Sequence, residues 1–162
     1  MKKEFQGAMA LLIERIEETQ VEAEGRFPIF SDRMTGEWCY ETGWTAPFWV
    51  ATNWLAYAYT SEKRFRDFAL DMFRKLDPYT ARFQYYIAGV LGYELTGLDL
   101  LRQKSIEASR FLCSMFNVTL EQIPAFPGGD DVIIDILPSL AVLWWDYTEN
   151  EAVESRDIAL AN

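Results

Sequence analysis

A short unit that recurs three times along the chain restricts its fold more than any other feature of the sequence. Each unit is an aromatic residue, a threonine three positions later and a short turn, and the units occupy residues 57–62, 93–98 and 145–150. Thr96 with Asp99, and Thr148 with Glu151, have the spacing of a capping box, in which two side chains bind free backbone N–H groups at a helix start. Each unit therefore predicts a turn from one helix into the next.

The helices on either side of these turns alternate in character. The second and fourth predicted helices are apolar nearly all round, which is typical of buried helices, and the third and fifth are amphipathic. Residues 25–43 are predicted as a long loop with short extended pieces. The predicted helices cover residues 3–24, 44–59, 61–76, 80–95, 98–116, 131–147 and 151 onwards.

A nearly apolar inner helix paired with an amphipathic outer helix is the unit from which an α/α toroid is built. We therefore expect an all-α fold, an α/α toroid of helical hairpins with about three of the six hairpins of a six-hairpin barrel. Residues 1–162 are expected to form a single domain, a partial barrel, and the alternative is an ordinary helical bundle.

Composition excludes several classes of function. The formal charge of −10 argues against nucleic acid and anionic membranes as partners, and no apolar run has membrane-spanning length. The chain contains no histidine, which excludes Ser-His-Asp and Cys-His catalysis and removes the commonest metal ligand, so we expect neither a metal nor a cofactor. The two cysteines and the absence of a signal-peptide pattern over 1–19 indicate a reduced compartment, the cytoplasm.

The stretch from Gly128 to Ser139 contains the strongest candidate for chemistry. Asp135 lies between apolar pairs at 133–134 and 136–137, so we expect its carboxylate to be drawn into the interior. Burial without a partner raises the pKa of a carboxyl group, which suits a proton donor near neutral pH. The alternative is that Asp135 is a helix N-cap, where the helix terminus would lower the pKa instead. Asp130 and Asp131 fit caps or solvated acids better than metal ligands.

Two blocks of sequence resemble the unsaturated glucuronyl hydrolases (glycoside hydrolase family 88) and their unsaturated rhamnogalacturonyl hydrolase relatives. Residues 44–49, Trp-Thr-Ala-Pro-Phe-Trp, with Trp-Leu at 54–55, resemble that family's Trp-Thr-x-Gly-Phe-Trp…Trp-Leu block. Residues 133–140, Ile-Ile-Asp-Ile-Leu-Pro-Ser-Leu, resemble its Ile-Ile-Asp-x-x-x-Asn-Leu block, and the turn Tyr-Glu-Leu-Thr-Gly at 93–97 is also similar. The resemblance runs from about residue 38 to the end of the chain, and other six-hairpin toroids share the repeat turn.

The resemblance implies an enzyme that removes unsaturated uronic acids from oligosaccharides by hydrating the vinyl-ether double bond. An aspartic acid protonates the double bond and its carboxylate then assists the addition of water, and this residue corresponds to Asp135. Trp44 is implied to line the sugar site, and Phe126 corresponds approximately to an aromatic residue of that site. Trp38 and Trp49 could also stack on sugar rings, but aromatic residues on apolar helices more often belong to the core.

The sequence departs from the family at a second active-site position. The family's His-Asp pair corresponds to Tyr79 and Thr80, so the second carboxylate is absent, and a small glycine position nearby is Arg82. Arg82 could bind a substrate carboxylate or form an ordinary ion pair. The alternative function is therefore a non-catalytic helical fragment, or a carbohydrate-binding or interaction domain. A sugar isomerase or epimerase is a weaker alternative, because those enzymes commonly use histidine.

A partial barrel also predicts a partner. Three hairpins would leave the apolar faces of the inner helices uncovered on one side, and exposed patches of that kind usually mark an interaction site. A homodimer formed through these inner-helix faces is one way to cover them.

Overall fold

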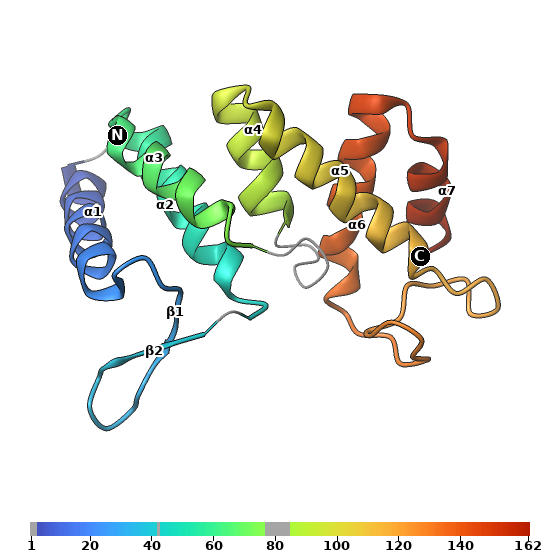
Figure 1. The fold of residues 1–162 in the computed structure, drawn as a ribbon, viewed down its shortest axis with the longest axis horizontal. Helices are drawn as coiled ribbons and strands as arrows, with labels where there is room; N and C mark the ends of the chain where they lie inside the picture. Colours follow the sequence, from blue (N-terminus) through green and yellow to red (C-terminus); the bar gives the residue numbers. More distant parts are fainter. Residues whose placement is uncertain (1–2, 42, 77–84) are drawn as a thin grey trace. The chain divides into compact units, whose positions relative to one another are not determined.

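The computed structural model describes residues 3–41, 43–76 and 85–162 of the chain. Helices account for most of these residues, and the chain divides into two compact units, Met1–Leu76 and Asp77–Asn162, coloured blue to green and green to red in Figure 1. The prediction of a single domain stays a prediction. The elements are α1 (Lys3–Ala23), β1 (Pro28–Ser31), β2 (Trp38–Tyr40), α2 (Ala46–Thr60), α3 (Lys63–Phe73), η1 (Tyr86–Val90), α4 (Leu91–Thr96), α5 (Asp99–Ser114), α6 (Ile136–Asn150) and α7 (Val153–Ala161).

The first unit is built around the hairpin of α2 and α3. Helix α2 begins with a proline in its first turn, where the missing N–H costs no helical bond, and it buries Val50 and Trp54 completely. Helix α3 is amphipathic and turns Phe65, Ala69, Met72 and Phe73 inward. These apolar contacts make α2 the inner helix and α3 the outer helix of the hairpin, as the sequence pattern predicts.

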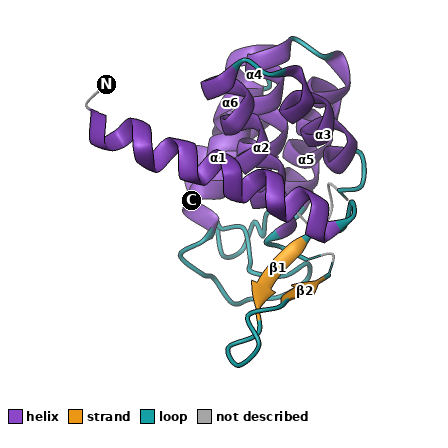
Figure 2. Ribbon diagram, turned by 90° about the vertical axis from the view of Figure 1, so that its left-hand side faces the viewer, coloured by secondary structure: helices purple, strands orange, loops and turns teal. Residues whose placement is uncertain are grey.

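A small antiparallel hairpin connects α1 to α2. Strands β1 and β2 pair Ser31 with Trp38 and Phe30 with Cys39, with an irregularity between Pro28 and Phe30 (Figure 2). The predicted loop with short extended pieces is thus confirmed.

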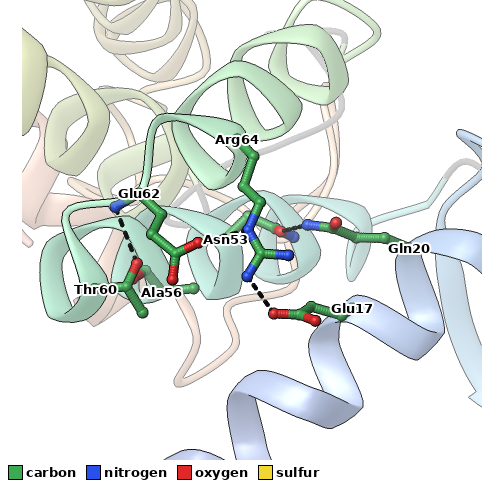
Figure 3. A network of polar contacts seen from close by, with 7 residues as sticks. All are labelled: Glu17, Gln20, Asn53, Ala56, Thr60, Glu62 and Arg64. Carbon is green, nitrogen blue, oxygen red and sulfur yellow. Dashed lines mark hydrogen bonds and ion pairs between the residues drawn. The ribbon is translucent and has the colours of Figure 1, made fainter.

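Side-chain hydrogen bonds attach α1 to the α2–α3 hairpin (Figure 3). Gln20 donates from Nε2 to Oδ1 of the buried Asn53 at 2.5 Å, and Asn53 in turn donates to the Trp49 carbonyl oxygen at 2.8 Å. Arg64 at the start of α3 pairs with Glu17 on α1 and, at 2.7 Å, with Glu62. These contacts fix the carboxyl-terminal half of α1 to the hairpin.

The second unit contains two further hairpins. Segment η1–α4 packs against α5, and α6 packs against α7 (Figure 1). Val90, Ile106 and Trp145 form a buried cluster to which Tyr93 adds an edge-to-face contact with Trp145, with ring centroids 6.1 Å apart. The inner and outer helices again alternate along the chain.

The recurrent turn has a backbone explanation. At the end of α2, α4 and α6 one residue adopts a left-handed conformation and donates its N–H to the carbonyl of a tyrosine four residues earlier. This is a helix C-terminal motif that satisfies an otherwise free carbonyl. The pairs are Ser61 with Tyr57 (φ 61°, 2.8 Å), Gly97 with Tyr93 (φ 68°, 2.7 Å) and Glu151 with Tyr147 (φ 56°, 2.8 Å).

The third turn therefore lies two residues later than predicted, and the capping boxes were a wrong prediction. Thr96 and Thr148 donate their hydroxyls backwards, to the carbonyls of Gly92 and Trp145, so neither caps the following helix. The residues at the N-cap positions of α5 and α7, Leu98 and Ala152, make no side-chain capping bond. Each threonine hydroxyl instead binds a carbonyl oxygen of the preceding helix, near its carboxyl-terminal end.

Several helix boundaries also differ from prediction, among them the start of the sixth helix. The sixth helix was expected from residue 131 but begins at Ile136, because residues 129–133 have no regular structure. The fourth was expected over 80–95, and its described part is a π-helical turn, η1, that continues into α4. Among the described residues, none of the helices is both long enough and apolar enough to span a bilayer.

Candidate active site

The segment between α5 and α6 holds the predicted acid, and backbone hydrogen bonds fix its course. Asn117 and Gln122 form an isolated antiparallel bridge, and the Ala125 N–H donates to the Asp131 carbonyl oxygen at 2.6 Å. The Gly129 N–H donates to the Phe126 carbonyl oxygen at 3.0 Å, and Gly128 between them has a positive φ of 74° that glycine adopts without strain. The glycine pair thus forms a defined turn that leads towards Asp135.

Asp135 occupies the N-cap position of α6 and is exposed. The predicted burial is wrong: a tight turn precedes the helix, in which the Ile136 N–H donates to the Ile133 carbonyl oxygen, and of the four flanking apolar residues only Ile136 is buried. Ile133 and Ile134 are 41% and 77% exposed. The alternative prediction gave the position correctly, although the Asp135 side chain makes no capping hydrogen bond.

The predicted sugar-binding aromatics are also exposed. Phe126 is 69% exposed in the same segment as Asp135, and Trp44 is 61% exposed just before α2. The Trp44 ring makes an edge-to-face contact with Phe48 at 6.4 Å. Phe126 and Asp135 therefore belong to one segment of the second unit, whereas Trp44 belongs to the first unit. The predicted positions Tyr79, Thr80 and Arg82 lie outside the described residues.

The remaining titratable groups near Asp135 are solvated. Asp130 and Asp131 are both exposed. Within residues 3–41, 43–76 and 85–162 no cluster of His, Cys, Asp or Glu has the arrangement of a metal site. The chemistry available at this segment is therefore that of accessible carboxyl groups, Asp135 among them, with the exposed Phe126 ring in the same loop.

Among the described residues the structure buries one carboxylate, that of Asp146, which sequence reasoning missed. Asp146 is only 3% exposed, and its Oδ2 accepts hydrogen bonds from the hydroxyls of Ser109 on α5 (2.7 Å) and Ser155 on α7 (2.9 Å). Its Oδ1 accepts a bond from the Asn150 amide at 2.8 Å. A buried charge with three donors is satisfied in place, so Asp146 joins α5, α6 and α7 rather than acting on a substrate.

The two cysteines are free, and the partly buried Cys113 lies beside this carboxylate. Burial raises the pKa of the Cys113 thiol, and its 3.6 Å contact with the Ser155 hydroxyl opposes that shift only in part. A thiol held in its neutral form is a poor nucleophile.

The observed arrangement, inner apolar helices paired with outer amphipathic ones, is that of part of an α/α toroid. Solved structures that share it include unsaturated glucuronyl hydrolases. The enzyme of Bacillus sp. GL1 superposes with a TM-score of 0.86 at 22% identity, over 97% of this chain and 46% of that one. An aspartate-to-asparagine variant named UGL, solved with dGlcA-Glc-Rha-Glc, has a TM-score of 0.88 at 25% identity, over 98% of this chain and 46% of that one. An unsaturated glucuronyl hydrolase specific for heparin has a TM-score of 0.78 at 23% identity, over 93% of this chain and 43% of that one.

Sequence comparison gives the same relationship. The curated unsaturated glucuronyl hydrolase of Bacillus sp. (strain GL1) is 28% identical over 154 residues, 85% of this chain and 41% of the relative. No family model matches the chain. The chain thus resembles unsaturated glucuronyl hydrolases in sequence and fold, and it spans about two fifths of the length of the curated relative.

Proposed function

We propose that this chain is part of a glycoside hydrolase that acts on unsaturated uronyl oligosaccharides, with Asp135 as the general acid and base. The observation that carries the proposal is the accessible carboxyl of Asp135 at the start of inner helix α6, in a block resembling the family's acid-containing motif. Similarity to a structure solved with a dGlcA-containing saccharide supports the substrate class.

The proposed reaction needs one carboxyl group and one water molecule. The Asp135 carboxyl gives its proton to one carbon of the vinyl-ether double bond, and the resulting carboxylate takes a proton from the water that adds to the other carbon. The hemiketal that forms then opens to a keto acid and releases the rest of the saccharide. Asp135 ends in its starting protonation state, which is the requirement for a group that acts first as acid and then as base.

Exposed aromatic rings support saccharide binding in this proposal. Trp44 and Phe126 each present a largely solvent-exposed ring, the kind of surface on which a sugar ring stacks. By resemblance to the family, Tyr79, Thr80 and Arg82 would contribute to saccharide binding, with the Arg82 guanidinium suited to the substrate carboxylate.

The test is the ultraviolet absorbance of an unsaturated uronyl disaccharide, which disappears when the double bond is hydrated. We expect turnover by the wild-type chain, a loss of at least about a hundredfold in Asp135→Asn, and little change in Asp131→Asn. Asp131 is the matched control because it is an exposed acid in the same loop. Equal rates for the two variants would show that Asp135 is not the acid.

A second candidate function is a non-catalytic domain that binds carbohydrate or another polypeptide. The observation that favours it is Thr80 at the family's second carboxylate position, in a chain that spans 41% of its curated relative. Saccharide binding to the wild-type chain without loss of absorbance at any pH would support this function. For either function we propose a cytoplasmic location, which the chain's cysteine content favours.

A further inference from the structure

A cleft in the first unit lies between α1 and the β1–β2 hairpin, which extends from the carboxyl-terminal end of α1 (Figure 2). Arg15 and Glu22 on α1 form one wall, and hairpin residues 35–38 with Tyr40 form the other. The volume of the cleft is about 480 Å³, within the range of sites that hold small ligands. The cleft belongs to the first unit, whereas Asp135 belongs to the second.

Contacts between the two walls fix the shape of this cleft. The Tyr40 hydroxyl donates to the Glu22 carbonyl oxygen at 3.1 Å, and the Arg26 guanidinium lies over the Tyr40 ring, 3.9 Å from its centroid. In the loop of the hairpin, the Asp32 carboxylate accepts the Thr35 N–H at 2.9 Å. A ligand therefore meets walls that are already ordered, which lowers the entropic cost of binding.

The polar groups that line the cleft retain hydrogen-bonding capacity of both kinds. The exposed Glu37 carboxylate makes no hydrogen bond or ion pair with another described residue, so it is available as an acceptor. Arg15 contacts Glu18 and Glu22 through one nitrogen, Nη1, at 2.9 and 3.5 Å. Its other guanidinium N–H groups are therefore available as donors. Such a pair of charged acceptor and charged donor matches the hydroxyl groups of a sugar, which both donate and accept.

Trp38 adds an apolar surface to these polar groups. This tryptophan, one of the rings that the sequence offers for stacking on sugars, is half-buried at the start of β2 and lines the cleft. An aromatic ring accepts the C–H face of a sugar, while hydroxyls at the edge of the sugar reach polar side chains. The cleft thus combines an aromatic wall with a few polar groups, as binding sites for small polar ligands do.

The charges that line the cleft indicate which sugars fit. Two acids, Glu22 and Glu37, and one cation, Arg15, are among the described residues of its walls. Because Arg15 is already paired with acids of α1, the unpaired Glu37 carboxylate determines the local potential. A uronyl carboxylate placed beside Glu37 would be repelled, whereas the hydroxyls of a neutral sugar would donate to it.

We propose that the cleft between α1 and the β1–β2 hairpin binds a neutral sugar unit. The sugar ring packs on Trp38, one of its hydroxyls donates to the Glu37 carboxylate, and another accepts an N–H of Arg15. The proposal rests on the proposed function for the class of ligand, a saccharide, but it does not depend on turnover at Asp135.

The probe is cellobiose, a neutral disaccharide without the double bond, titrated into the ¹⁵N-labelled chain. We expect a Kd of about 1 mM, with the largest amide shifts over residues 35–40. Glu37→Gln should weaken binding about tenfold, because it replaces a charged acceptor with a neutral one. Glu41→Gln is the matched control and should leave the Kd unchanged, since Glu41 is an exposed acid directly after β2 that does not line the cleft. Circular dichroism shows whether each variant is folded.

Three outcomes would overturn the proposal. They are an absence of binding at about 10 mM cellobiose, shifts centred outside residues 35–40, and equal weakening by Glu37→Gln and Glu41→Gln. Tighter binding of a saturated disaccharide that contains glucuronic acid would overturn the assignment of a neutral sugar. Because the probe cannot be hydrated, a failure to turn over an unsaturated uronyl disaccharide counts only against the proposed hydrolase.

Discussion

Replacing Asp146 with alanine removes the carboxylate at which three helices of the second unit meet. In the native protein its Oδ2 accepts bonds from Ser109 on α5 and Ser155 on α7, at 2.7 and 2.9 Å, and its Oδ1 accepts one from Asn150 at 2.8 Å. Bonds to a charged acceptor contribute about 1.5–3 kcal/mol each, although desolvation of the carboxylate offsets part of this sum.

The expected loss in the free energy of unfolding depends on which hydrogen bonds the three donors can form once the carboxylate is removed. The Ser109 and Ser155 hydroxyls are 3.2 Å apart and can bond to each other, so only one buried hydroxyl is left without an acceptor, at about 1–3 kcal/mol. Asn150 is exposed and regains water. With a small cavity term, we expect Asp146→Ala to lower the free energy of unfolding by about 2–4 kcal/mol. In Asp146→Asn the amide oxygen still accepts from both serines, and the expected loss is about 1 kcal/mol.

Urea unfolding followed by tryptophan fluorescence measures these losses, since Trp145 is buried in the same unit. With a slope of about 2 kcal/mol per molar, the alanine variant should shift the midpoint down by roughly 1–2 M. The control is Asp157→Ala on α7, an exposed carboxylate paired with Arg156 at 2.6 Å, which should cost less than about 0.5 kcal/mol. The reasoning is refuted if Asp146→Ala is no more destabilising than this control, or if asparagine is worse than alanine.

Three further changes test other parts of the structure. Ser61→Gly should stabilise the first unit by about 0.5–1 kcal/mol in thermal unfolding because Ser61 holds a left-handed φ of 61°; a destabilisation would contradict this. Burial raises the pKa of the Cys113 thiol, so its contribution to stability is present below the unfolded-state pKa and is lost as pH rises through the folded-state pKa. Stability at alkaline pH should therefore fall less in Cys113→Ala than in the wild type, as measured by urea midpoints against pH. Thr80→Asp, which restores the family's second carboxylate, should raise the rate of absorbance loss with an unsaturated uronyl disaccharide by about tenfold or more. No increase would argue that Thr80 does not correspond to the family's second active-site carboxylate.

Much of the helical organisation could be predicted because it depends on local patterns. The apolar character of α2 and the amphipathic character of α3 and α5 specify inner and outer helices directly. The ends of helices were harder to predict, since a threonine hydroxyl fits both a capping box and a bond to the preceding turn. Thr96 makes the second kind of bond, and the left-handed Gly97 that follows it explains why the helix ends there.

The place of Asp135 in the fold was predicted, but its environment was not. Asp135 does precede an inner helix, and Phe126 lies in the same loop. Their exposure could not be predicted, because Asp135 and the apolar residues before it lie outside the helix, in a turn and an irregular segment. Neighbours in sequence indicate burial only where a helix or strand fixes the direction of their side chains.

The spacing of buried residues along α6 identifies Asp146 as a buried acid, which the argument from apolar neighbours in sequence missed. Within α6 the buried positions Ile136, Ser139, Leu143 and Asp146 follow one another at intervals of three or four residues, so Asp146 belongs to the stripe that faces the core. Asp135 lies four residues before Ser139, but it precedes the helix and is exposed. The two carboxylates of this helix therefore have different roles. Asp146 holds α6 in place between its neighbours, and Asp135 at its start stays accessible, so a saccharide, or the remaining hairpins of a toroid, would have to provide the enclosure that a proton donor needs.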